Sequence, residues 1–364
     1  MPCCLVILAL ILVIHCSPGK SQPKFTDDLQ LRLSYHYGFV LPEYSLFTYL
    51  VHDPVRSAEL SLSKETSGKT VWEQLYNYPE YGISLYYSTL GNDKVFGREV
   101  AVYPHFTAHY ISTERFDLDN KVGMGLGYVT KRFDLEENFR NIAVGSRLNI
   151  HFSFELGARY RLALRTEVHA GLAFNHFSNA NSAEPNLGIN WVTAYGGLSY
   201  RPGNLTEHRI NEIPPHKRET EFALLVALGA KSTRALTSDR YLTSSISFEL
   251  NRKVWPKFHF GIGPDLFFDS STETEMEALS RFGHKGIYDF RTGIHISQEI
   301  VYNRFSLILQ EGVYLLLTDK VGDNIMYNRA ILRYKVTKKF LVNFAMKSHL
   351  HILDYPELGI GMYW

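Results

Sequence analysis

The sequence has few cysteines, almost no net charge and no long apolar run. Its three cysteines are Cys3, Cys4 and Cys16, so the body of the chain can hold no disulfide framework, no catalytic thiolate and no cysteine-ligated metal. A formal net charge of +1 gives no indication of a nucleic-acid partner or of electrostatic attachment to a membrane. After the N-terminus, no segment approaches the roughly 20 apolar residues of a membrane-spanning helix.

The N-terminus carries an apolar run at residues 5–14, which is too short to span a bilayer as a helix. A polar segment from His15 to Gln22 follows. This order predicts a secretory signal peptide over residues 1–22, with cleavage near Ser21 or Gln22. A lipoprotein site at Cys16 is the alternative, although His15 before it is bulky and polar.

Most of the remaining chain alternates apolar and polar residues. Apolar residues make up 45% of the chain, yet the mean hydropathy is −0.15, as expected when the two kinds interleave. A period of two predicts β-strands. Eight runs lie before the middle of the chain, at about 31–39, 58–62, 82–88, 100–109, 122–130, 144–154, 160–178 and 188–201. Eight more follow at about 222–228, 241–252, 257–268, 287–302, 304–318, 326–336, 339–352 and 356–364.

These runs favour a membrane barrel over a soluble β-sandwich. Many exceed ten residues, whereas soluble strands typically have about 5–6. One face carries rows of Arg, Lys, Glu and His, and the other carries Leu, Phe, Val, Ile and Tyr. A polar interior and an apolar exterior are typical of a transmembrane barrel. The chain also ends in Met362-Tyr363-Trp364, similar to the closing strand of outer-membrane barrels. We therefore expect an all-β, transmembrane, antiparallel up-and-down β-barrel protein.

The runs divide the chain into two halves of similar size. After the signal peptide, residues 23–201 form the first half, a polar, proline-bearing linker or turn covers 202–219, and residues 220–364 form a second half with the size of a diverged repeat. Two arrangements remain open: one barrel of about 16 strands, or two eight-stranded barrels in tandem. A single closed barrel removes every sheet edge, which favours the first.

A histidine and a serine stand at the end of one apolar stripe. His176 and Ser178 are two residues apart, so in a strand their side chains share a face. The even positions before them are apolar: Leu162, Leu164, Thr166, Val168, Ala170, Leu172 and Phe174, with Thr166 the exception. The pair therefore continues the lipid-facing stripe. If both termini are periplasmic, this seventh strand ends at the outer leaflet, where lipopolysaccharide lies. Such a position suits an enzyme with a lipid substrate.

The segments from His176 to Ala180 (His-Phe-Ser-Asn-Ala) and from Pro185 to Asn190 (Pro-Asn-Leu-Gly-Ile-Asn) resemble the signature of outer-membrane lipid A 3-O-deacylases, the acyloxyacyl hydrolase-like family. The resemblance covers about residues 30–201 and is strongest at 171–201. It implies a bacterial outer-membrane serine esterase that removes an ester-linked acyl chain from lipid A, with lipopolysaccharide of the outer leaflet as its partner and no cofactor.

The resemblance also assigns roles to individual residues. His176 matches the catalytic base, Ser178 the nucleophile, and Asn179 the residue that helps to bind the oxyanion. The glutamate that orients the histidine in the family falls on Asn190, which can accept a ring N–H but cannot supply charge. Glu184, in the same loop, could take its place. Further substrate contacts are expected from the motif residues Phe174, Ala180 and Asn186.

Because Asn190 replaces an acid, a second function stays open: a weak or inactive barrel that serves as a pore, a structural protein or a lipid-binding protein. A 16-stranded barrel could hold a water-filled lumen. In the second half, His349 and His351 loosely echo the first motif, but they fall on the polar face and are expected to line the interior. The histidines show no clustered ligand spacing, so no metal site is predicted.

Overall fold

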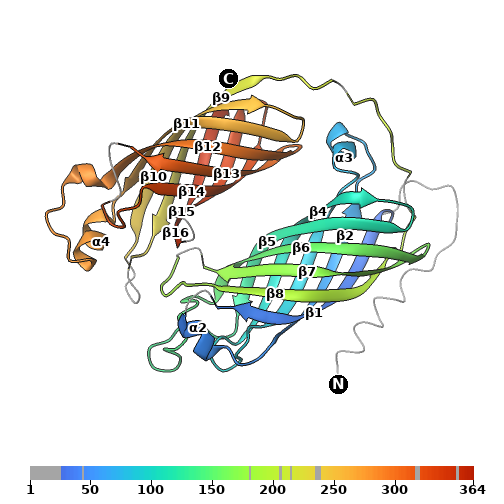
Figure 1. The fold of residues 1–364 in the computed structure, drawn as a ribbon, viewed down its shortest axis with the longest axis horizontal. Coiled ribbons are helices and arrows are strands. Elements are labelled where there is room, and N and C mark those ends of the chain that lie inside the picture. Colours follow the sequence, from blue (N-terminus) through green and yellow to red (C-terminus); the bar gives the residue numbers. More distant parts are fainter. Residues whose placement is uncertain are drawn as a thin grey trace.

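The computed structural model describes residues 26–42, 45–179, 182–204, 207–213, 215–233, 239–315, 320–349 and 352–364. Its strands form two closed antiparallel barrels of eight (Figure 1). The predicted signal peptide at 1–22 lies outside the described residues. Among the helices in these ranges, none has the length and apolar character needed to cross a membrane.

Barrel 1 consists of eight strands that pair in chain order. They are β1 (Leu29–Leu41), β2 (Val55–Glu65), β3 (Glu80–Thr89), β4 (Arg98–Ser112), β5 (Phe116–Val129), β6 (Leu148–Ala163), β7 (Thr166–Ser178) and β8 (Ile189–Tyr200). Two short helices, α2 (Ser45–Leu50) and α3 (Val71–Leu75), lie in its connections.

Barrel 2 has the same order. Its strands are β9 (Thr220–Lys231), β10 (Tyr241–Lys253), β11 (Phe258–Asp269), β12 (Phe290–Tyr302), β13 (Phe305–Tyr314), β14 (Met326–Lys335), β15 (Phe340–His349) and β16 (Ile352–Tyr363). The helix α4 (Thr272–Ala278) and the 3-10 helix η1 (Gly286–Asp289) lie between β11 and β12.

The sixteen expected strands are present, and the second of the two proposed arrangements is the one observed. The single 16-stranded barrel is wrong because β8 closes onto β1, with Leu31 opposite Tyr200. In the same way β16 closes onto β9, with Gly361 opposite Leu225. Each set of eight thereby removes its own edges, so the edge argument that favoured one large barrel applies equally to two small ones.

The largest error in the predicted strand boundaries lies between β6 and β7. Residues 160–178 were expected to form one strand, but β6 continues to Ala163 and β7 begins at Thr166. Leu162 and Leu164, at and beside this tight turn, continue the alternation of apolar and polar residues. The sequence pattern therefore shows no break where the turn occurs.

Both barrels have the same orientation. Because each barrel has an even number of strands, its first strand begins and its last strand ends at the same end, which we call the inner end. The strands β1 and β9 begin there, and β8 and β16 end there. Most of the long connections, including those after β1, β5, β7 and β11, lie at the opposite, outer end, and the connection at 66–79 between β2 and β3, which contains α3, is the exception at the inner end. The barrels also touch near their inner ends, where the Tyr76 hydroxyl donates to the Val301 carbonyl at 2.9 Å and its ring lies 4.6 Å from that of Tyr302.

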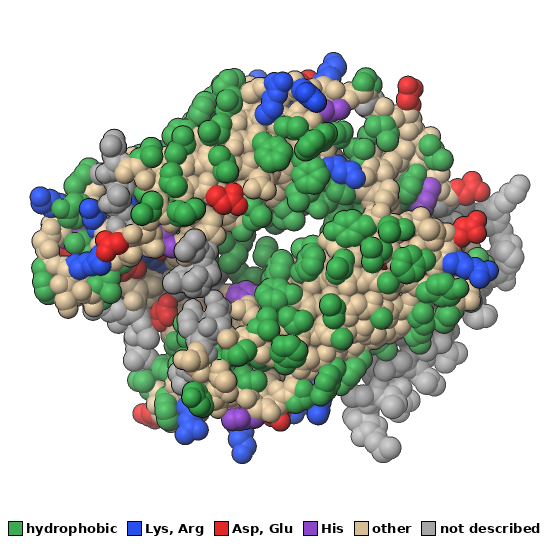
Figure 2. Space-filling view, in the orientation of Figure 1, with side chains coloured by type: hydrophobic (Ala, Val, Ile, Leu, Met, Phe, Trp, Pro, Cys, Tyr) green, Lys and Arg blue, Asp and Glu red, His purple; other side chains and the backbone are tan. Residues whose placement is uncertain are grey.

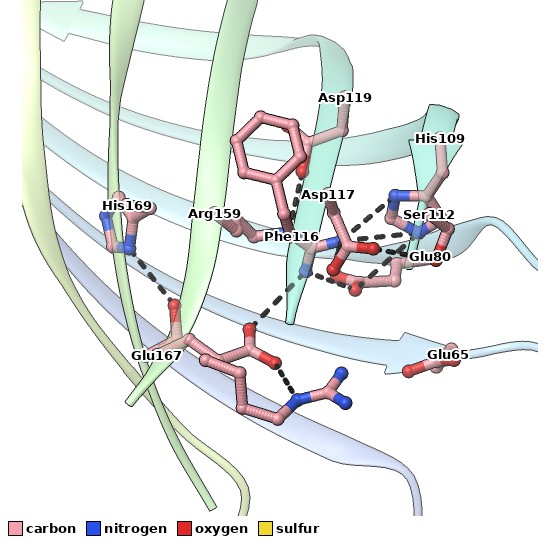
Figure 3. Close-up of polar contacts among 12 residues, drawn as sticks. Glu65, Glu80, His109, Ser112, Phe116, Asp117, Asp119, Arg159, Glu167 and His169 are labelled. Atoms are coloured by element: carbon pink, nitrogen blue, oxygen red, sulfur yellow. Dashed lines mark hydrogen bonds and ion pairs between the residues drawn. The ribbon is translucent and has the colours of Figure 1, made fainter. Parts of the chain in front are cut away.

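The predicted inside-out pattern is confirmed. Apolar side chains cover the visible outer walls of both barrels, and charged side chains lie mainly near the ends (Figure 2). The interior holds ion pairs instead. In barrel 1, Arg159 contacts Glu80 and Asp119 at 2.6 Å each, and all three side chains are almost completely buried (Figure 3). Burying these charges is tolerable because each is paired.

The outer end of barrel 1 departs from this pattern. Its interior is filled by apolar side chains, which we call the outer-mouth cluster: Val40, Phe47, Val55, Tyr86, Leu90, Val95, Phe96, Ala101, Tyr103, Val129, Ala143, Val144, Phe177, Ile189 and Trp191. These come from the inward faces of the strands and from the outer connections. The outer end therefore has a packed core of the kind found in soluble proteins.

Candidate active site

The histidine–serine pair lies on the outward face of β7, where this strand ends. Along β7, His169, Asn175 and Phe177 are buried in the interior, and the alternate residues are more exposed. His176 has this outward orientation and is partly exposed. Ser178 shares the face but is only 5% exposed. The structure thus places both side chains on the lipid-facing wall at the outer end of barrel 1.

The two side chains are joined by a hydrogen bond, and Asn190 extends the line. His176 Nε2 lies 3.0 Å from Ser178 Oγ, and His176 Nδ1 lies 2.6 Å from Asn190 Oδ1. Asn190 is directly opposite His176 in the β7–β8 pairing. Because Oδ1 can only accept, Nδ1 carries the proton and Nε2 is the acceptor for the Ser178 hydroxyl. This is the tautomer that a general base requires.

Glu184 does not replace the missing acid. Both ring nitrogens of His176 are already bonded, to Asn190 and to Ser178. The Glu184 carboxyl is half-buried in the β7–β8 connection, and this burial raises its pKa. The position that would orient the imidazole is therefore held by a neutral amide.

Asn179 and Asn186 fold the chain that follows Ser178. The Asn179 backbone N–H donates to Asn186 Oδ1 at 2.8 Å. The Asn179 side chain accepts from the Ser182 N–H at 2.9 Å and donates from Nδ2 to the Ala183 carbonyl at 2.7 Å. One Nδ2 proton is thus committed to the loop. Ala180, the other predicted contact residue in this segment, lies outside the described residues.

Phe174 adds an apolar surface beside the pair. It lies on the same outward face, two residues toward the inner end from His176. Across the strand pair, Phe152 of β6 is opposite His176 and Phe154 is opposite Phe174. Phe174 and Phe154 thus lie one step toward the inner end from the polar pair, and Phe152 lies beside His176.

Gly188 is a site residue that the sequence did not reveal as one, although it lies within the second motif. Its φ of +70° belongs to the left-handed region that favours glycine. A Cβ here would lie 3.0 Å from His176 Cε1 and 3.3 Å from Ser178 Cβ. The Gly188 N–H also donates to the Ala143 carbonyl at 2.9 Å. Its backbone packs directly against the pair, which only glycine permits.

The wall behind the pair is rigidly packed. Phe177, Ile189 and Trp191, on β7 and β8, are at most 1% exposed and belong to the outer-mouth cluster. The β5–β6 connection adds to this support, since Asn141 Oδ1 accepts from the N–H groups of Ala143 and Val144. Packing from the barrel interior therefore fixes the strands that carry the polar pair outside.

Other polar groups lie inside the barrels. His36, Glu59 and Glu155 have ligand atoms within 4.8 Å of one another. The Lys121 ammonium contacts Glu59 and lies 2.7 Å from Glu155, so a cation already occupies this position. In barrel 2, His349 Nε2 lies 2.9 Å from the hydroxyl of buried Tyr314, which confirms its inward orientation. His351 lies outside the described residues.

Comparisons with known proteins match both halves of the chain. A family model described as lipid A 3-O-deacylase matches residues 56–199. A second, described as the C-terminal domain of acyloxyacyl hydrolase, matches residues 220–364. The family relationship therefore extends beyond the first half, to which the sequence motifs had confined it. No match was found among curated proteins.

Solved structures similar to this chain include a bacterial surface protein and an outer membrane enzyme. Neisserial surface protein A is 11% identical with a TM-score of 0.32, and the match covers 48% of this chain and 97% of that one. The outer membrane enzyme PagL is 15% identical with a TM-score of 0.32, and the match covers 46% of this chain and 97% of that one.

Proposed function

This outer-membrane β-barrel protein belongs to the lipid A 3-O-deacylase family, and we propose that it is an esterase that hydrolyses an ester-linked acyl chain of lipid A or a related glycolipid. The observation that carries the proposal is the hydrogen-bonded line from Asn190 through His176 to Ser178 on the outward wall. A nucleophile, a base and an orienting group in this order are the arrangement needed for acyl transfer.

The proposed reaction uses only groups of this chain and water. His176 Nε2 takes the proton of Ser178 Oγ as the oxygen attacks the ester carbonyl. The second Nδ2 proton of Asn179 is the donor that we assign to the oxyanion. The tetrahedral intermediate collapses, the sugar oxygen takes the proton from His176, and an acyl-serine remains. Water, deprotonated by His176, then releases the fatty acid and regenerates Ser178.

The depth of the pair suits a glycolipid ester. In membrane barrels, short turns face the periplasm and long loops face outward, so the outer end lies at the outer leaflet. An ester bond joins a sugar headgroup to a buried chain. Ser178 at the end of β7 would meet that bond, and Phe174 with Phe152 and Phe154 would contact the acyl chain below it.

The alternative function is a non-catalytic barrel that serves as a pore, a structural protein or a lipid-binding protein. Of these, the pore is less well supported than the esterase. The pore depended on a wide 16-stranded barrel, whereas eight-stranded barrels are just wide enough for side chains to fill. Barrel 1 is filled at its outer end by the outer-mouth cluster. A structural or lipid-binding role remains as the competing outcome of the test.

Mass spectrometry of lipid A from expressing cells tests the proposal. We expect one acyl chain to be lost with the wild type and retained with Ser178→Ala. Ser244→Ala is the matched control, because Ser244 is also an outward-facing serine, half-buried on β10 of barrel 2. Heat-modifiable migration on a gel shows that each variant is folded. Identical lipid A profiles for wild type, Ser178→Ala and cells without the protein would refute the proposal.

A further inference from the structure

Three exposed arginines lie at the outer end of barrel 1, where its even-numbered strands begin. Arg56 is the first outward residue of β2, Arg98 is the first of β4, and Arg147 immediately precedes β6. All three side chains are exposed to the surroundings of the barrel. We call them the arginine row.

The register places these arginines at one level of the barrel wall. The Arg56 N–H donates to Thr89 Oγ1 of β3, and the Arg98 N–H donates to Thr130 Oγ1 beside β5, each at 2.9 Å. The Val129 N–H donates to the Arg147 carbonyl, also at 2.9 Å. The arginines therefore occupy alternate strands in one hydrogen-bonded row from β2 to β6.

Arg147 is the member of this row next to the proposed nucleophile, since β6 pairs with β7, whereas Arg98 on β4 and Arg56 on β2 are each three strands away from β7 around the barrel. Ser178 is opposite Ile150 of β6, and Arg147 is three residues farther toward the outer end on that strand. At about 3.3 Å per residue, the Arg147 backbone is roughly 10 Å farther along the strand direction than Ser178, which is roughly 7–8 Å along the axis of a barrel whose strands tilt by about 35–45°. An arginine side chain spans much of that distance, so its guanidinium can lie over the headgroup of a lipid whose ester is at Ser178.

Outward tyrosines bind two of the three guanidinium groups, and a third tyrosine is the cross-strand neighbour of Arg56. Arg98 Nη1 donates to the Tyr87 hydroxyl at 2.9 Å, and Arg147 Nη1 donates to the Tyr128 hydroxyl at 3.0 Å. Tyr37 is directly opposite Arg56. Tyrosines with an apolar ring and a polar tip belong at the membrane interface, so these pairs mark headgroup depth.

The row keeps a positive charge. Asp93 accepts from Nε and Nη2 of Arg98 at 2.9 and 2.7 Å, which offsets that one charge. Across the part of the chain that the structure describes, no carboxylate lies within ion-pair distance of Arg56 or Arg147. Two guanidinium groups therefore present unneutralised charge to the outer leaflet.

Barrel 2 provides an internal comparison. The first residues with outward exposure on β10, β12 and β14, which correspond to β2, β4 and β6, are Leu242, Phe290 and Met326. None is charged, and of the residues immediately before these three strands only Arg240 is an arginine, so barrel 2 has one exposed arginine at these positions where barrel 1 has three. A general need for arginine at the outer rim does not explain this difference. The row accompanies the barrel that carries His176 and Ser178.

We propose that the arginine row binds headgroup phosphates of the outer leaflet, and that Arg147 holds the glycolipid whose ester meets Ser178. The guanidinium group matches phosphate with paired N–H donors and stays charged at every relevant pH. This inference deepens the proposed function, since the lipid held by Arg147 is the one that Ser178 would attack. It predicts that phosphorylated glycolipids are preferred over unphosphorylated ones with the same acyl chains.

Binding to the full-length protein in detergent micelles tests this inference. Ser178→Ala is included in every variant, so that no turnover occurs. The probes are bis-phosphorylated lipid A, the same lipid A after removal of both phosphates, and inorganic phosphate. The test variant is Arg56→Gln/Arg98→Gln/Arg147→Gln. The matched control is Arg115→Gln/Arg165→Gln/Arg304→Gln, which removes three exposed arginines from inner-end turns.

We expect the test variant to bind phosphorylated lipid A about 25-fold more weakly, from roughly fivefold for each of the two arginines that have no carboxylate partner. The control variant should bind like the parent, and dephosphorylated lipid A should bind all variants equally. Equal binding of phosphorylated lipid A by parent and test variant would overturn the inference. Competition by inorganic phosphate at the concentrations at which the lipid binds would also overturn it, in favour of a free-phosphate site.

The outcome is separable from that of the proposed function. If the wild type releases no acyl chain but the arginines still determine binding, the phosphate site stands and the esterase fails. If acyl release occurs and the arginines have no effect on binding, the esterase stands and the phosphate site fails. Single Gln variants of Arg56 and Arg147 repeat the measurement should the triple variant fold poorly.

Discussion

The replacement Asn190→Glu should accelerate acyl release. Asn190 Oδ1 lies 2.6 Å from His176 Nδ1, so it already selects the tautomer in which Nε2 can take the Ser178 proton. What it lacks is charge. During the reaction His176 becomes an imidazolium ion, and a carboxylate in this position would stabilise that ion.

The size of the effect can be estimated from the geometry. Two unit charges about 4 Å apart at an effective dielectric constant of about 20 attract by about 4 kcal/mol. Partial burial of the carboxylate offsets part of this gain, because the charge loses hydration. A net stabilisation of about 1.5–3 kcal/mol corresponds to roughly a 10- to 100-fold increase in rate.

The assay is the initial rate of fatty-acid release from lipid A in detergent micelles, with folding checked by heat-modifiable migration. Asn190→Gln is the matched control, since it has the length of glutamate without the charge, and it should be no faster than wild type. If folded Asn190→Glu were no faster than Asn190→Gln, charge at this position would not limit the reaction, and the reasoning would be refuted.

Three further predictions test the site and its scaffold. Gly188→Ala should lower acyl release at least tenfold, because its Cβ would meet His176 at 3.0 Å, whereas Gly283→Ala, which also has positive φ but has nothing within 4 Å of its Cβ, should leave the rate unchanged. Arg159→Leu should lower the unfolding free energy in urea by about 3–5 kcal/mol, because it strands buried carboxylates, and exposed Arg165→Leu should change it little; equal midpoints would contradict the structural role of the interior ion pairs. In planar bilayers the protein should show no steady conductance, since side chains fill an eight-stranded barrel, and stable ohmic channels would favour the pore.

The strands could be predicted from the sequence because a membrane barrel repeats one simple physical rule. Every residue faces either lipid or the interior, so the alternation from Leu31 to Tyr37 continues through the chain. Barrel closure follows no such rule. Whether β8 pairs with β1 or with β9 depends on contacts between distant residues, and the apolar pattern is the same in both cases.

The candidate site was predictable to a similar extent. The spacing of His176 and Ser178 places them on one face of any strand, and the structure brings them within 3.0 Å. Their roles in catalysis stay a prediction. The contribution of Gly188 could not be inferred, because its importance comes from a close approach between the β7–β8 connection and β7. The arginine row could not be inferred either, since its members are far apart in sequence and are aligned only by the register of five strands.

The packed outer-mouth cluster has a consequence for the second half of the proposed reaction. Hydrolysis of an acyl-serine needs one water molecule for each turnover. Phe177, Ile189 and Trp191 pack the interior directly behind the strands that carry the site, so the barrel side of Ser178 is closed by side chains. In the proposed reaction its other side faces lipid, and water approaches from the headgroups, along the β7–β8 connection. The position of Ser178 at the outer end of β7 would therefore set how quickly the acyl-serine is hydrolysed, and a serine two residues deeper would meet less water.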